Sequence, residues 1–591
     1  MNIDQLSIMV ILLIAMGLFI WGKWRYDVVA LMMLFTCALL GLVPATQVFS
    51  GFGHPATITV AIVLILSYGL AKSGAIEGLT SIISPLSSIH SLHIAALSLI
   101  AAFLSMFMNN VGALALLMPA AVQSSIKAGW STSSVLIPLS FSSILGGLVT
   151  LIGTPPNIII ATYRADITGE PFSMLDFSPV GGAVAAAGIA FMILIGWRLV
   201  PERKRSSEIG LFNIESYLFE VKLLKDSDLK GKTVKELEAI LDGRDTALVS
   251  LIHKKQYYPA PPKRHRLITN DLLILKGKQE DVDNLVSKHG LALLGADSAR
   301  EAVLHSADTV VMEIVLVPGS RLEGRTVQQV RFKANYGINL LAISRQDPRG
   351  RLRAVKLKVG DVLLVHGGKD EVEGALVRFG CLPLEGRGVG FGKRKYALPA
   401  LVIFASAIAM SILGSVAIAV SLGSAVVLFV LFNIIPTREL YDGIEWPVIV
   451  LLGAMIPVGG ALEHTDVTTL MASGFLNFAG ETSIVVVLAA ILIITMTLSD
   501  VLNNAATAIL MAPIAKDIAE LTNVSADPFL MAVAIGASCA FLTPIGHQNN
   551  ALILGPGCYR FSDYWRVGLP LEIIVVLVSI PLILVIWPLS S

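Results

Sequence analysis

Long apolar runs, separated by polar stretches, dominate this chain of 591 residues. A membrane-spanning helix needs about 20 mostly apolar residues. The candidate spans are 4–22, 28–43, 55–74, 134–162, 179–200, 397–412, 414–435, 447–462, 528–556 and 568–588. Charged residues make up only 15% of the sequence, against about a quarter in soluble domains. These runs predict a polytopic α-helical membrane protein, and the net charge of +1 disfavours a nucleic-acid partner.

Two sequence motifs each occur twice at nearly the same offset. FMNNVGALALLMP at 107–119 is matched by VLNNAATAILMAP at 501–513, 394 residues later. TLIGTPPN at 150–157 is matched by TPIGHQNN at 543–550, 393 residues later. Two motif pairs at nearly one offset predict that the two halves of the chain are internal repeats.

The orientation of the halves follows from the number of membrane crossings in each half and from the Lys and Arg residues of the loops. If the interrupted apolar stretches 92–126 and 484–516 are re-entrant hairpins, each half has five true crossings, and the second half is inverted. With the N-terminus outside, the inner loops contain Lys23, Arg25, Lys72, Lys127, Arg438, Arg560 and Arg566. The outer loops contain Arg164 and Lys516. This asymmetry agrees with the positive-inside rule and places the segment between the halves in the cytoplasm. We also expect the segment around His464 and Asp466 to be an outer loop.

The polar segment between the halves contains a duplication of its own. LKGKTV at 229–234 is matched by LEGRTV at 322–327, and DLLIL at 271–275 by DVLLV at 361–365. Alternating strand-like and helix-like runs predict two small α/β domains. The expected organisation is a first transmembrane repeat at 1–200, α/β domains at 211–294 and 308–385, a linker at 386–396, and a second repeat at 397–591.

Four breaks in the apolar pattern mark the expected site. A break inside a bilayer leaves peptide groups without partners, so it persists where it lines a buried or watery cavity. In transporters, paired broken helices bind anions at half-helix N-termini and cations at unwound carbonyls. The breaks lie at 109–112, 152–157, 503–506 and 545–550. Asparagine there offers both a donor and an acceptor.

Asp500 and His547 distinguish the second half from the first. The repeat counterpart of Asp500 is Met106, and an ionisable residue at membrane depth is expensive and usually functional. We expect Asp500 to assist coupling to sodium or to a proton. His547 either contacts the substrate or caps backbone groups at its break, and the sequence leaves both roles open.

With these motifs, the chain resembles the divalent anion:sodium symporter (DASS) family of the ion transporter superfamily. It is more closely similar to the branch that carries two TrkA-C (RCK-C) domains between its halves, which includes sulfate permeases. The resemblance covers nearly the whole chain, and its specific parts are the two tips, GTPPN and the stretch GPGCYRFSDYWRVGLPL at 555–571. It implies a homodimer in the plasma or inner membrane, elevator-type transport, and TrkA-C domains that sense a small ligand or mediate assembly.

The resemblance also implies site residues. One sodium site would be formed by Ser105, Asn109, Asn110 and Gly153, and the other by Ser499, Leu502, Asn504 and Gly546. The substrate would contact Asn109, Asn110, Val111, Thr154, Asn503, Asn504, Ala505, His547 and Gln548. Sodium would be the coupling ion, with no tightly bound cofactor.

This chain departs from the family at the tips. The family motif there is Ser-Asn-Thr, and both tips keep its central asparagine but lose its two hydroxyl residues. This departure favours a small divalent oxyanion such as sulfate over a dicarboxylate. A dicarboxylate or other organic anion, sodium–proton exchange and a gated channel remain alternatives. No catalytic motif indicates an enzyme.

Overall fold

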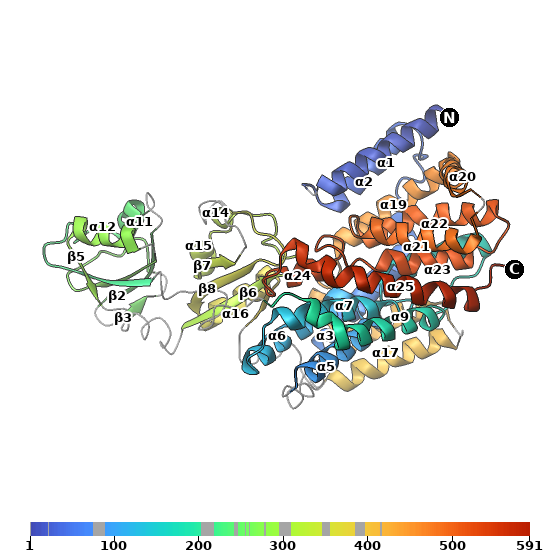
Figure 1. Ribbon diagram of the computed structural model, residues 1–591. Coiled ribbons are helices and arrows are strands. Elements are labelled where there is room, and N and C mark those ends of the chain that lie inside the picture. Colours follow the sequence, from blue (N-terminus) through green and yellow to red (C-terminus); the bar gives the residue numbers. More distant parts are fainter. Residues whose placement is uncertain are drawn as a thin grey trace. The chain divides into compact units, whose positions relative to one another are not determined.

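The computed structural model of the chain (Figure 1) divides into two compact units. It describes residues 2–21, 23–74, 89–202, 218–241, 246–253, 256–258, 261–276, 279–294, 309–344, 355–384, 396–413, 416–480 and 482–590. The helical unit comprises 1–202, 388–553 and 560–591. The inserted unit comprises 203–387 together with the short segment 554–559.

The helical unit repeats its order of helices. The first half contains α1 (Ile3–Trp21), α2 (Tyr26–Leu39), η1 (Ser50–Gly53), α3 (Pro55–Lys72), α5 (His90–Ser105), α6 (Asn110–Lys127), α7 (Ser133–Gly147), α8 (Pro155–Thr168), α9 (Ser178–Phe191), η3 (Met192–Gly196) and α10 (Trp197–Leu199). The second half contains α17 (Ala397–Ile412), α18 (Ile418–Leu431), η6 (Thr437–Glu439), α19 (Trp446–His464), α20 (Val467–Ala479), α21 (Ile484–Ser499), α22 (Asn504–Leu521), α23 (Asp527–Ser538), α24 (Gln548–Leu554), η7 (Phe561–Asp563) and α25 (Tyr564–Ile586). α21 and α22 start 394 residues after α5 and α6, the offset of the first motif pair.

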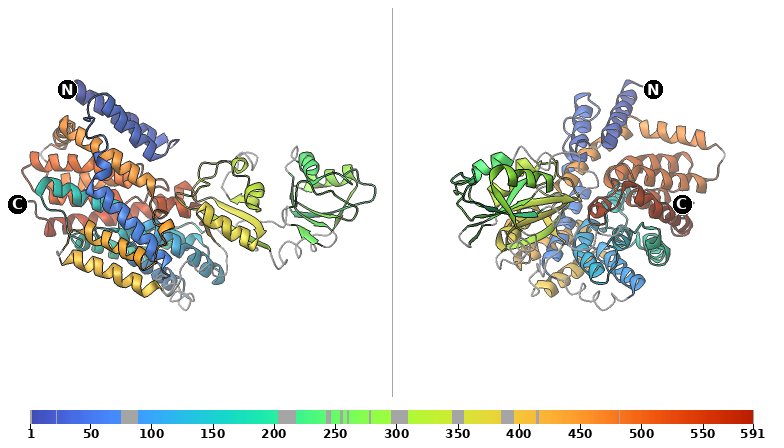
Figure 2. Two further views of the ribbon diagram at one scale, coloured as in Figure 1. Left: turned by 180° about the vertical axis from the view of Figure 1, so that it is seen from behind. Right: turned by 60° about the vertical axis from the view of Figure 1, so that its left-hand side comes forward.

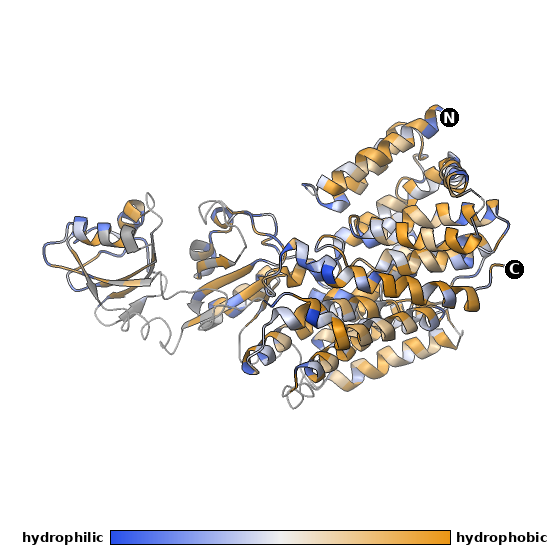
Figure 3. Cartoon of the chain, viewed as in Figure 1, coloured by the Kyte–Doolittle hydropathy of each residue, from blue (hydrophilic) through white to orange (hydrophobic). Residues whose placement is uncertain are grey.

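The composition of these helices suits a bilayer. In the described residues, five helical stretches are long and apolar enough to cross a membrane: Ile3–Trp21, Pro55–Lys72, Ser178–Leu199, Trp446–His464 and Phe561–Ile586. Large apolar side chains also point outward, as on α1, where Leu13 and Ile20 are exposed. Figure 3 shows apolar residues along most helices of this unit. An outer surface of this kind is stable in lipid, which is as apolar as the side chains themselves.

The two halves pack on one another reciprocally. α2 packs against α19 of the other half, and α18 packs against α3. α9 packs against α25, and within the halves α5 packs on α7 as α21 packs on α23. Small residues permit the close approaches: a Cβ on Gly146 would overlap the backbone of Ala102, and one on Gly536 would lie 2.9 Å from Leu492 O. Figure 2 shows these helices from two further directions.

The expected loop around His464 and Asp466 is a two-residue turn. α19 continues to His464, Thr465 and Asp466 form the turn, and α20 begins at Val467. Asp466 precedes α20 in the left-handed conformation, with a φ of 57°. The Glu463 carboxylate accepts a hydrogen bond from Tyr163 OH. α20 is only 13 residues long, so its apolar run is shorter than the length from which spans were predicted.

The inserted unit contains two antiparallel sheets with helices. The first set of elements is β1 (Leu218–Leu223), α11 (Val234–Leu241), β2 (Ala247–His253), β3 (Gln256–Tyr258), β4 (Leu272–Lys276), α12 (Gln279–His289) and β5 (Leu291–Leu294). The second is β6 (Thr309–Leu316), α14 (Val327–Val330), α15 (Phe332–Tyr336), β7 (Asn339–Ser344), β8 (Val362–Gly368), α16 (Lys369–Phe379) and β9 (Cys381–Pro383).

The strand orders of the two sheets correspond. They are β3-β2-β4-β1-β5 and β7-β8-β6-β9, with each pairing antiparallel. Each sheet has its own apolar core, which includes Val221 and Leu273 in the first and Ile314 and Leu363 in the second. The same elements in the same order are what a duplication of one α/β unit produces.

Candidate functional site

Both Asn-Asn motifs lie where one helix ends and the next begins. α5 ends at Ser105 and α6 begins at Asn110, while α21 ends at Ser499 and α22 begins at Asn504. The first asparagine of each motif caps the following helix. Asn109 Oδ1 accepts from Val111 N–H at 3.2 Å, and Asn503 Oδ1 accepts from Ala505 N–H at 3.0 Å. Each tip is therefore a helix N-terminus in which the cap occupies one free N–H group.

The second pair of motifs braces the tips by the same bonds in both halves. Thr150 Oγ1 donates to Met106 O, and Thr543 Oγ1 donates to Asp500 O at 2.7 Å. Asn157 Nδ2 donates to Thr150 O at 2.9 Å, and Asn550 Nδ2 donates to Thr543 O at 3.1 Å. The bonds explain why these residue types recur: they hold the segments before α8 and α24 against the preceding tips.

A serine and an asparagine oxygen meet at each tip. Ser105 Oγ donates to Asn110 Oδ1 at 2.5 Å, and Ser499 Oγ lies 2.9 Å from Asn504 Oδ1. Glycine brings the second motif close: a Cβ on Gly546 would lie 2.8 Å from Ser499 O. A hydroxyl, an amide oxygen and nearby main-chain carbonyls are oxygen ligands suited to a hard cation.

The remaining predicted sodium residues are also near. A Cβ on Gly153 would overlap Gly147 O, and a Cβ on Gly147 would overlap Asn110 Oδ1. Gly147 therefore lies between Gly153 and the side-chain oxygen of Asn110. Leu502 is buried within the second tip. The structure thus brings each predicted sodium set to one tip.

Asn110 links the first tip to the second half. Its Nδ2 lies 3.3 Å from His547 Nε2, and its backbone carbonyl accepts from Asn549 Nδ2 at 3.2 Å and from Ser143 Oγ at 2.9 Å. His547 Nδ1 accepts from Asn549 N–H at 3.1 Å. A neutral imidazole that accepts at Nδ1 carries its hydrogen on Nε2. His547 Nδ1 therefore accepts from the backbone at the start of α24, and its Nε2–H points toward Asn110 Nδ2.

A carboxylate that the sequence analysis did not identify also reaches the first tip. Asn109 Nδ2 donates to Glu445 Oε1 at 2.6 Å, and Gln548 also bonds the Glu445 side chain. Gln548 Nε2 lies 3.4 Å from Tyr26 OH. Glu445 is the residue immediately before α19, and nothing in its local sequence pairs it with Asn109. In the described residues, Asn503 has no equivalent carboxylate.

Asp500 has an acidic neighbour. Its Oδ1 accepts from Leu542 N–H at 2.9 Å, and the Glu572 carboxyl lies within hydrogen-bonding reach of its side chain. Asp500 is 3% exposed and Glu572 is 7% exposed. Across the part of the chain that is described, Asp500 Oδ2 and Glu572 Oε1 accept from no donor. Glu572 could have been identified from sequence, since it is an acidic residue inside the apolar run of α25.

Thr154, a predicted substrate contact, lies at the start of α8. It is buried and precedes α8, but its side chain does not cap that helix. The starts of α8 and α24 differ. His547, Gln548 and Asn549 at the start of α24 bond to other helices, whereas α8 begins with Pro155 and Pro156. No Lys or Arg of the described residues bonds to any predicted site side chain. The site consists of neutral donors, oxygen acceptors and carboxylates.

Paired broken helices with polar tips, inside a helical unit with an apolar exterior, define a multi-pass membrane transporter. The citrate transporter (CitMHS) family matches residues 16–536, and the chain belongs to this family of the ion transporter superfamily. An uncharacterized transporter of Synechocystis sp. is 30% identical over 98% of this chain and 96% of its own length. The uncharacterized transporter YfbS of Escherichia coli is 28% identical over the whole of both chains. Sodium/sulfate cotransporter 2 of Chlamydomonas reinhardtii is 27% identical over 55% of this chain and 38% of its own.

Proposed function

We propose that the protein is a sodium-coupled symporter of a small divalent oxyanion, with sulfate as the first candidate. The observation that carries this proposal is the pair of capped tips, each with a serine–asparagine oxygen pair beside a helix N-terminus. Two relatives of Chlamydomonas reinhardtii are named sodium/sulfate cotransporters 2 and 1, and a third is named probable sodium/sulfate cotransporter 3, at 26–27% identity. Their names support the cargo, and the tips suggest where it binds.

The anion would bind between the tips. The N-termini of α6 and α22 carry partial positive charge and N–H groups besides the one that each cap occupies, which would bind an oxyanion without Lys or Arg. α8 adds no N–H donor at its start, because it begins with Pro155 and Pro156. Asn110 Nδ2 and His547 Nε2 are adjacent donors at 3.3 Å. Two N–H groups that face each other are unfavourable alone, and an oxyanion that accepts from both would remove the conflict.

The cations would bind on the far side of each tip from the anion. Ser105, Asn110 and Gly153 would form one sodium site, and Ser499, Asn504 and Gly546 the other, with Asn109 and Leu502 supplying main-chain oxygens. Sodium bound there would balance the charge of the anion. It would also order each tip, so that anion affinity depends on sodium.

The architecture proposed around this site is an inverted repeat. Reciprocal packing of α2 on α19 and of α18 on α3 supports a two-fold relation between the halves. α5–α6 and α21–α22 would be the re-entrant hairpins, and each would move with its tip in an elevator-type step. We further propose a DASS-like homodimer in the plasma or inner membrane, with two cytoplasmic TrkA-C-like domains at 211–294 and 308–385 that bind a small regulatory ligand.

A proton-coupled carrier of an organic anion is the second candidate. The matching family is described as citrate transporters, and a carboxyl pair such as Asp500–Glu572 can hold one proton between two oxygens. Sodium–proton exchange would use the same pair.

Uptake into proteoliposomes distinguishes these functions. Radiolabelled sulfate, citrate and succinate are compared under an inward sodium gradient, an inward proton gradient, or neither. Sulfate uptake that requires sodium is expected. Citrate uptake that requires only a proton gradient would replace the first candidate by the second, and sodium efflux driven by protons without anion uptake would favour exchange.

A further inference from the structure

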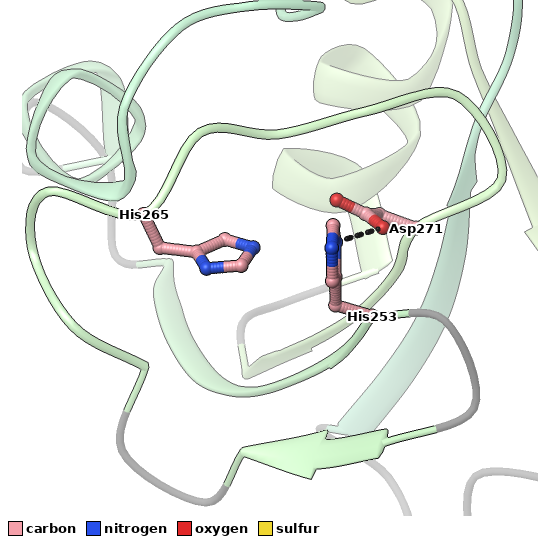
Figure 4. Close-up of side chains that lie close together, drawn as sticks. All are labelled: His253, His265 and Asp271. Carbon is pink, nitrogen blue, oxygen red and sulfur yellow. Dashed lines mark hydrogen bonds and ion pairs between the residues drawn. The ribbon is translucent and has the colours of Figure 1, made fainter.

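Two histidines and an aspartate converge at one end of the five-stranded sheet, outside the transport site (Figure 4). His253 is the last residue of β2, and Asp271 immediately precedes β4, its antiparallel neighbour. His265 lies in the segment that leads into β4. Figure 4 shows the His265 ring turned toward His253, whose own ring faces the Asp271 carboxylate.

The geometry is that of an incomplete ligand set. His253 Nδ1 lies 2.9 Å from Asp271 Oδ1, and the two imidazole rings are nearly perpendicular, with centroids 4.4 Å apart. One donor atom from each of the three residues lies within 4.8 Å of the others. His265 Nε2 is buried, and in the described residues it has no hydrogen-bond partner. A buried ring nitrogen without a partner is costly unless something else binds it.

The second α/β set shows which of these residues the fold itself requires. Asp271 Oδ2 accepts from Ile268 N–H at 2.8 Å, and Asp361 Oδ2 accepts from Lys358 N–H at 2.8 Å, directly before β8. The aspartate is therefore explained in both copies as a cap of the turn that enters the strand.

The histidines have no such explanation. The bridges Thr233–Arg266 and Thr326–Lys356 align the two copies, so the residue at the position of His265 is Val355, which packs against the second core. The strand ladders align Ile252 with Ser344, and the next residue in the sequence is His253 in the first copy and Arg345 in the second. The same fold forms in the second copy with neither histidine.

We propose that His253, His265 and Asp271 form a binding site for a transition-metal dication, with zinc as the first candidate. Two imidazoles and one carboxylate are a common zinc set, with a fourth position open to water, whereas magnesium and calcium prefer oxygen ligands alone. Zinc ligands at about 2.0–2.1 Å would lie about 3.3 Å apart. The donor atoms lie within 4.8 Å of one another, so rotation of the side chains must bring them closer by about 1.5 Å.

The surroundings are compatible with a dication. Asp271 is 1% exposed, so its charge is poorly screened by water and is available to the metal. The basic neighbours Lys263, Arg264 and Arg266 are exposed, where solvent screens their repulsion. A bound ion would join the end of β2 to the segment before β4, and so would make the conformation of the first α/β set depend on metal.

Zinc binding to the full-length protein in detergent tests the site. After chelator treatment, zinc is titrated at pH 7.5 against a chromophoric chelator, with magnesium and calcium as comparison ions. His265→Val introduces the residue of the second copy, so it is compatible with the fold, and His253→Gln removes the other imidazole. His289→Gln is the matched control, because His289 pairs with Asp228 in the same set, away from these ligands. Thermal unfolding without metal confirms that each variant is folded.

One zinc ion per chain is expected to bind to the wild type and to His289→Gln. Loss of one imidazole should weaken binding at least about 100-fold, since even changes to residues behind the ligands cost 10–100-fold. Zinc that binds His265→Val as tightly as wild type, or a wild type that binds no zinc in competition with the chelator, would overturn the proposal. Equal affinity for magnesium would also overturn it.

Discussion

The pairing of Asp500 with Glu572 makes a quantitative prediction about coupling. Both carboxyls are buried, and Leu542 N–H donates a hydrogen bond to Asp500 Oδ1. Two full negative charges about 4 Å apart repel by about 4 kcal/mol at an effective dielectric constant of about 20. The pair must therefore hold a proton or lie beside a cation. Whichever ion binds there is bound more tightly than either carboxyl alone would bind it.

Asp500→Asn removes one charge and keeps the oxygen that accepts from Leu542 N–H. Glu572→Gln removes the other charge and leaves that bond untouched. If about half of the 4 kcal/mol acts on the coupling ion, the half-saturating cation concentration should rise about 30-fold. Uptake into proteoliposomes is measured against sodium at fixed pH and against pH at fixed sodium. The dependence that changes identifies the coupling ion.

Met106 provides the control for these variants. It occupies the position of Asp500 in the first half, and Met106→Leu keeps its size and apolar character. Uptake by this variant should keep the wild-type cation dependence. If Asp500→Asn and Glu572→Gln fold and transport with unchanged dependence on both sodium and pH, the pair has no part in coupling and the reasoning is refuted.

Three further predictions concern other parts of the chain. His547→Asn removes the donor at Asn110 and should raise the KM for the anion more than tenfold with little change in sodium dependence, as measured by uptake; an unchanged KM would exclude substrate contact. Asn503→Ala removes a helix cap and should lower stability by about 1 kcal/mol, while Asn109→Ala, which also loses the Glu445 bond, should cost more; equal shifts in the Tm of purified protein would contradict this. Burial lowers the pKa of His366 to about 4 from an ordinary 6.5. The unfolded chain therefore takes up the proton first, and the free energy of unfolding of the sheet that contains β8 should fall by up to about 3 kcal/mol between about pH 6.5 and pH 4. Hydrogen exchange of the β8 amides should show this loss in the wild type and not in His366→Gln.

Much of the fold could be predicted because its signals are local. Apolar runs long enough to span a bilayer specify helices, since only helices satisfy every backbone group within one segment. The strand-like runs 219–223 and 313–317 and the helix-like runs 234–241 and 279–288 coincide with β1, β6, α11 and α12 for the same local reason. α20 was missed because its run is short, and its sequence does not show which neighbours cover it.

The candidate site was predicted in part. The motif repeats identified the tips, and the tips do bring Ser105 to Asn110 and Ser499 to Asn504, partners only five residues apart. Glu445 was missed because its partner Asn109 is 336 residues away. Glu572 carried a signal, an acidic residue in an apolar helix, but its partner could not be read from the chain.

The apolar helices of the membrane unit, the positions at which they break, the two repeated motif pairs and the polar insert can all be read along the chain. Hydrophobicity, proline and asparagine act on the nearest few residues, so their effects can be read along the chain. Which polar groups meet depends on the three-dimensional packing: His547 lies beside Asn110 across 437 residues, and His253 lies beside both Asp271 and His265. Such contacts form because the packing of apolar faces brings the polar residues together, and no local sequence pattern shows which residues will meet.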